Sequence, residues 1–139
     1  MGRDGAIASS DKSEMDEAGS SWIGRGKVRA REIPGGVEIA IDGVTTQARY
    51  YKPLVYEFFR RDFALRPRWG EYEVAILMTH VGEAPRLDLD NLAKALLDAL
   101  KGFVYFDDHQ IAKLLCERVA GERDHICVIA KRMAAPRTP

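Results

Sequence analysis

Apolar and polar residues alternate in several short stretches of the chain, which is the pattern of half-buried β-strands. The clearest of these stretches is 37–42, and a similar alternation runs from 27 to 33. The sequence Pro-Gly-Gly at 34–36 predicts a turn between them, so the first ordered element is expected to be a hairpin. Residues 125–132 also alternate, whereas 72–81 is apolar on both faces, as in the central strand of a sheet.

Two further stretches have apolar residues at helical spacing. Pro53 is expected to be the first residue of one helix, where its missing N–H costs nothing. The clearest helix is predicted for 89–100, followed by Gly102 as its stop signal. Residues 103–106 are predicted to be short, extended and buried, and 111–119 fits a strand as well as a helix. The apolar positions of the second helix are Leu89, Leu92, Ala93, Leu96, Leu97 and Leu100.

Length and composition indicate one globular domain. The chain has 139 residues, with 46% hydrophobic and 30% charged side chains, which is a folded rather than a disordered composition. We expect a disordered acidic tail at 1–21, a domain at 22–133 and a loose tail at 134–139. No stretch is apolar enough for a membrane span, and the start lacks the apolar core of a secretory signal. The two cysteines lack metal-site spacing and predict free thiols in a cytoplasmic protein.

The charge of the chain is unevenly distributed. The 21 basic side chains balance the 21 acidic ones, but the first 20 residues contain two basic and five acidic residues. The remainder therefore carries a net charge of +3. This distribution permits a DNA partner without requiring one.

Two pairs of acidic residues are candidates for a metal-binding site. Asp88 and Asp90 open the strong helix, where the helix dipole and an ion pair from Asp90 to Lys94 would explain them structurally. Asp107 and Asp108 are adjacent carboxylates that repel each other, and a divalent cation would remove that repulsion. We expect the connection through 102–106 to bring this second pair back near the helix. Carboxylate ligands alone suit Mg²⁺ or Mn²⁺.

These residues resemble the signature of the RusA family of Holliday-junction resolvases, over roughly 86–119. The resemblance implies a single α/β domain with a mixed sheet, packed helices and a homodimeric state, and it makes 111–119 a strand. It also implies a Mg²⁺-dependent endonuclease (crossover junction endodeoxyribonuclease) for which Mn²⁺ can substitute. The matching positions are Asp88-Leu89-Asp90-Asn91-Leu92-x-Lys94, Asp98-Ala99-Leu100, Gly102 and Asp107-Asp108-x-Gln110-Ile111.

By this resemblance Asp88, Asp90 and Asp108 are metal-binding acids, Asp107 is their companion and Lys94 is the catalytic lysine. Lys94 lies one helical turn from Asp90, so it can reach the same phosphate. The expected partners are a four-way DNA junction and a second copy of the chain, with no membrane and no small-molecule cofactor. The proposed dimer interface is either the apolar face of the sheet or the leucine-rich helix.

DNA binding requires a basic frame around these acids. Arg86 is the best candidate because it lies two residues before Asp88. Two other functions stay open: a catalytically silent protein that binds branched DNA, and a small metal-dependent phosphatase or nucleotide hydrolase. No glycine-rich phosphate loop supports the last one. The remaining candidates for DNA contact are Arg29, Arg31, Arg60, Arg61, Arg66 and Arg68, together with Lys131, Arg132 and Arg137 near the end of the sequence.

Overall fold

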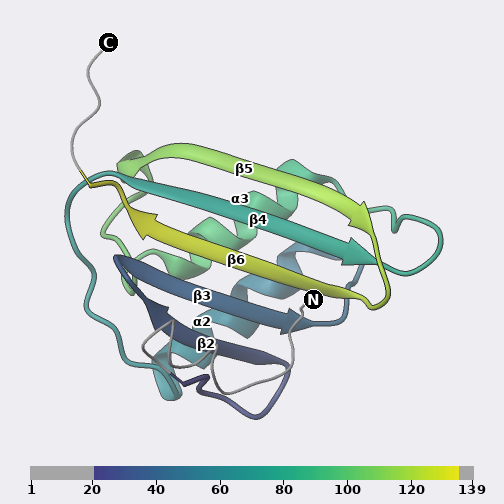
Figure 1. Cartoon of the computed structure of the whole chain (residues 1–139), viewed down its shortest axis with the longest axis horizontal. Coiled ribbons are helices and arrows are strands. Elements are labelled where there is room, and N and C mark those ends of the chain that lie inside the picture. Colours follow the sequence, from purple (N-terminus) through teal and green to yellow (C-terminus); the bar gives the residue numbers. More distant parts are fainter. Residues whose placement is uncertain (1–20, 135–139) are drawn as a thin grey trace.

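A five-stranded mixed sheet in the order β2-β3-β6-β4-β5 forms the centre of the protein (Figure 1). The computed structural model describes residues 21–134, so the two predicted tails lie almost wholly outside the described residues. Only β4 and β5 are parallel, and the other neighbours are antiparallel. The predicted α/β class with a mixed sheet is thus confirmed. The strands are β2 (Val28–Ile33), β3 (Gly36–Asp42), β4 (Tyr72–His80), β5 (Ile111–Ala120) and β6 (His125–Arg132).

The hairpin and the central strand follow their sequence patterns. β2 and β3 pair from Val28 opposite Ile41 to Ile33 opposite Gly36. Gly35 adopts φ +79° in the turn, a conformation that favours glycine. Buried and half-buried residues alternate along the whole of β4, which lies between β6 and β5. Residues 111–119, whose pattern fitted a strand as well as a helix, belong to strand β5, as the family resemblance implied.

Two α-helices, α2 (Tyr51–Arg61) and α3 (Leu89–Leu100), cover one face of the sheet (Figure 1). Helix α2 begins two residues before Pro53, so the predicted start was wrong. Proline is still tolerated as the third residue of the helix, because the first four N–H groups of a helix have no partner within it. Neither helix in the described part of the chain is long and apolar enough to cross a membrane.

The apolar stripe of α3 belongs to the core. Leu92, Leu96 and Leu100 are at most 1% exposed, and each such burial contributes about 1.5–3 kcal/mol. The leucine-rich side of this helix is therefore covered within the chain, which removes it as the dimer interface considered above.

The segment after α3 turns instead of extending. The N–H groups of Phe103 and Val104 both donate to the carbonyl of Leu100, and Gly102 has φ +90°. Val104 and Tyr105 are buried, but Phe106 is 40% exposed. The prediction of an extended, buried stretch at 103–106 was wrong, because the chain reverses as soon as the helix ends.

Candidate active site

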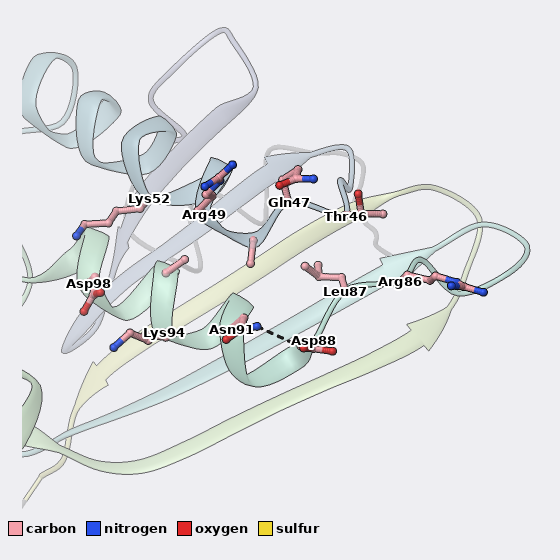
Figure 2. A pocket seen from close by; sticks show the side chains of 12 residues that line it. Thr46, Gln47, Arg49, Lys52, Arg86, Leu87, Asp88, Asn91, Lys94 and Asp98 are labelled. Carbon is pink, nitrogen blue, oxygen red and sulfur yellow. Dashed lines mark hydrogen bonds between the residues drawn. The ribbon is translucent and has the colours of Figure 1, made fainter.

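A pocket of about 460 Å³ lies between α3 and the segment that leads into α2 (Figure 2). That segment contains the short 3₁₀ helix η1 (Ala48–Tyr50). Three of the predicted site residues, Arg86, Asp88 and Lys94, are brought together here. The pocket is lined by Thr46, Gln47, Ala48, Arg49, Lys52, Arg86, Leu87, Asp88, Asn91, Lys94, Ala95 and Asp98.

The carboxylate of Asp88 is available for a ligand. Asp88 is the N-cap residue of α3 and has extended backbone dihedral angles, but its side chain does not cap the helix. It accepts one long hydrogen bond, 3.3 Å, from the Asn91 amide and is otherwise exposed. An exposed carboxylate of this kind suits a hard divalent cation.

Lys94 and Asp90 do not form the ion pair that would explain them structurally. The structure describes both side chains, and no contact within 4 Å links the amine to the carboxylate. Asp90 instead accepts a hydrogen bond of 3.0 Å from the backbone N–H of Asn91. Lys94 lines the pocket together with Asp88, whereas Asp90 lies outside it.

The second acidic pair lies at the opposite end of α3. Strands β4 and β5 are parallel, so α3 must run back along the sheet between them. Asp88 and Asp90 are at its first turn, and Asp107 contacts Lys101 just beyond its last turn. A helix of 12 residues separates the two ends by about 18 Å.

The two acidic pairs therefore do not meet within one chain. Among residues 21–134 no group of three or more His, Cys, Asp or Glu side chains is arranged to hold a metal ion. The connection through 102–106 does return to the helix, but it returns to the C-terminal end.

The two neighbouring aspartates have different surroundings. The His109 ring lies 2.6 Å from Asp107 and the Lys101 amine lies 3.3 Å from it, and these contacts, His109 first, lower the pKa of Asp107 to about 2. Asp108 is exposed and forms no hydrogen bond or ion pair with its side chain in the described part of the chain. Asp107 is thus engaged within the protein, while the Asp108 carboxylate is available.

Gln110 holds the turn that carries these aspartates. Its side chain is buried, 4% exposed, and its Oε1 accepts hydrogen bonds from the N–H groups of Phe106 and Asp107. Its Nε2 donates to the carbonyls of Arg68 and Gly70, at 2.9 Å each. The turn is therefore tied to the loop before β4. In the sequence, only the family resemblance drew attention to Gln110.

Replacing Gln110 by leucine should destabilise the protein by roughly 2–4 kcal/mol, because it leaves four backbone groups without their partners. Denaturant unfolding measures this directly. Gln47→Leu is the matched control, since Gln47 is exposed and a surface change of this kind shifts stability by only about 0.5 kcal/mol. Equal effects of the two substitutions would contradict the role given to Gln110.

The predicted DNA-contacting arginines fall into three groups. Arg29, Arg31 and Arg60 form ion pairs with Asp42, Glu38 and Glu57 at 3.0, 2.8 and 2.8 Å. Arg86 lines the pocket. Arg61, Arg66 and Arg68 are exposed outside the pocket. The same holds for Lys131 and Arg132, whereas Arg137 lies outside the described residues.

Two basic residues of the pocket, Arg49 and Lys52, were not identified from the sequence. They lie three residues apart, Arg49 in η1 and Lys52 in the first turn of α2, and in the sequence this spacing resembles that of any solvated helix face. Only the packing of this segment beside α3 reveals that they share a pocket with Asp88 and Lys94.

Fold and pocket together define a small α/β protein whose acidic and basic side chains share one open site. The family model described as Endodeoxyribonuclease RusA matches residues 46–130, which include every residue of the pocket and both acidic pairs. The chain belongs to this family of endodeoxyribonucleases, which resolve Holliday junctions. Nucleases of the family bind branched DNA and generally depend on a divalent metal. No curated protein is significantly similar to the chain.

Proposed function

We propose that the protein is a Mg²⁺-dependent endonuclease that resolves four-way junctions by paired phosphodiester hydrolysis during DNA recombination and repair. The observation that carries this proposal is the pocket in which the exposed carboxylate of Asp88 and the amine of Lys94 lie among further cations. This combination suits a phosphodiester, which needs both a metal-binding carboxylate and positive charge around the scissile phosphate.

The active site in this proposal is shared between two copies of the chain. Asp88 and Asp90 lie at one end of α3 and Asp108 lies beyond its other end, and the helix between them is about 18 Å long, too long for these residues to bind one ion. A two-fold dimer with antiparallel α3 helices would bring Asp108 of the partner subunit to Asp88 and Asp90. Two-fold symmetry then produces two equivalent sites, which match the two symmetric strands of a junction.

The free edge of β5 is the interface that best fits this dimer. Strand β5 ends the sheet and pairs only with β4 in the described chain. Leu114, Leu115 and Val119 are 46%, 53% and 37% exposed, which is an aggregation risk for an unpaired edge. Antiparallel pairing of β5 with its copy would cover them. Because the Cys116 thiol lies 3.7 Å from the Leu89 carbonyl, the start of α3 is already beside this strand.

Each residue has a distinct task in the proposed reaction. The carboxylates of Asp88 and Asp90, with Asp108 from the other subunit, would hold Mg²⁺ or Mn²⁺. When bound, the cation supplies an acidified water and neutralises charge on the phosphate. Lys94 offsets the negative charge that develops on the phosphate oxygens. Arg86 binds the DNA strand at the entrance of the pocket. Asp107 keeps the turn that carries Asp108 in place through His109 and Lys101.

Mixing two inactive variants tests the shared site. Asp88→Asn/Asp90→Asn protein and Asp108→Asn protein should each fail to cleave. In a mixed dimer one site has both mutations and the other has neither, so random mixing should restore roughly a quarter of the wild-type sites. These sites should nick one strand of a junction. A mixture that exchanges subunits, shown by a labelled partner, and stays inactive would contradict the shared site.

A cleavage assay of the wild-type protein separates the alternative functions when the substrates are a four-way junction, a linear duplex and free nucleotides. We expect cleavage of the junction alone. Binding without cleavage by the wild type would favour the catalytically silent DNA-binding protein. Hydrolysis of nucleotides alone would favour the phosphatase.

A further inference from the structure

We infer that Arg49 and Lys52 bind the phosphates that flank the scissile one, and so form the wall of the DNA-strand site opposite α3. This inference rests on the proposed function. It assigns a substrate-binding role to two residues of the segment that precedes and opens α2. Both are binding residues, with no part in the chemical step.

The two residues lie on the opposite side of the pocket from the candidate catalytic residues. Arg49 belongs to η1 and Lys52 to the first turn of α2, while Asp88, Lys94 and Asp98 come from the cap and the polar side of α3 (Figure 2). Arg49 and Lys52 are both exposed. A DNA strand lying in the pocket would therefore have Lys94 on one side and these two cations on the other.

The charges of the pocket favour an anionic ligand. Four cations, Arg49, Lys52, Arg86 and Lys94, line it with only two carboxylates, Asp88 and Asp98. Within residues 21–134 none of these four cations lies within ion-pair distance of an acidic side chain, whereas Arg29, Arg31 and Arg60 each have a carboxylate partner. When unpaired cations such as these bind phosphates, they release the counterions condensed on the DNA, and this release favours binding.

Tyr51 fixes the backbone between the two cations. Its ring is 1% exposed, and its hydroxyl oxygen accepts a hydrogen bond of 2.8 Å from the N–H of Thr45. Arg49 and Lys52 are three residues apart on either side of this anchor, so they project from one helical surface. Their backbone positions are set before DNA binds, which lowers the ordering cost of the contact.

The test is the salt dependence of junction binding by the full chain, measured by gel shift in EDTA between 50 and 200 mM salt. Each lost phosphate contact reduces the slope of log K against log salt concentration by about 0.9. Arg49→Gln/Lys52→Gln should therefore reduce the slope by about 1.8 or more and weaken binding roughly tenfold at intermediate salt. The charge-retaining variant Arg49→Lys/Lys52→Arg should keep most of the slope.

Arg25→Gln/Arg123→Gln is the matched control, because it removes the same charge from exposed residues outside the pocket. An unchanged slope for Arg49→Gln/Lys52→Gln would overturn the inference, as would an equal loss in the control. Melting temperatures near that of the wild type confirm that all variants are folded. A wild type that binds no junction would refute the proposed function, and the inference with it, before any variant is compared.

Discussion

Asp108→Asn is expected to abolish junction cleavage while folding and metal-free junction binding are retained. The substitution keeps the size and shape of the side chain but removes one anionic ligand from the proposed metal site. Junction affinity in EDTA should hold or increase, since the surface that faces DNA becomes less negative. The Asp108 side chain forms no hydrogen bond or ion pair in the described part of the chain, and its neighbour Asp107 is a carboxylate with a pKa of about 2. Removing the repulsion between them should leave the melting temperature unchanged or raised.

Cleavage rate, gel-shift affinity and melting temperature should be measured on one preparation, with Mg²⁺ and with EDTA. Asp62→Asn is a suitable control because Asp62 is an exposed aspartate at the end of α2, outside the pocket. If Asp108 is only a residue of a solvated turn, cleavage will stay near the wild-type rate. Retained cleavage would refute the assignment of Asp108 to the metal site.

The elements that could be predicted from the sequence are those whose own periodicity determines which face is buried. The hairpin 28–42 has a two-residue period and glycines at its turn, and α3 has leucines every three or four residues. In both cases the local pattern and the final packing agree, so the secondary structure and the buried face follow from the sequence without knowledge of tertiary contacts.

The turn at 103–106 could not be predicted in this way. Four consecutive apolar residues have no period, and they are compatible with a strand or with a compact turn. The outcome depends on hydrogen bonds to the Leu100 carbonyl and on the buried Gln110, whose partners Arg68 and Gly70 are some 40 residues away in the sequence.

The separation of the acidic pairs has a topological cause. Residues 111–119 had to be known as a strand parallel to β4 before the direction of α3 could be deduced. The helix of a parallel crossover runs from the carboxyl end of the first strand back to the amino end of the next, so its two ends lie at opposite ends of the strands. The residue types at Asp88, Asp90 and Asp108 indicated metal chemistry, but only the fold shows that one chain does not assemble them.

Lys94→Ala should slow cleavage by about 10²-fold or more while junction affinity changes little, if its charge acts on the transition state. The amine lines the pocket beside Asp88 and forms no ion pair with Asp90, so no structural partner is lost. Alanine is also the best helix former, which means that the melting temperature should not fall.

Single-turnover cleavage at saturating protein separates the chemical step from binding. Raising the Mg²⁺ concentration should not restore the rate of Lys94→Ala, because the missing charge belongs to the protein and not to the ion. If affinity and rate fall by the same factor, Lys94 is a contact to the DNA backbone of the kind inferred for Arg49 and Lys52. An unchanged rate would mean that the charge of Lys94 has no part in the reaction. The main argument for assigning catalysis to this pocket would then fail.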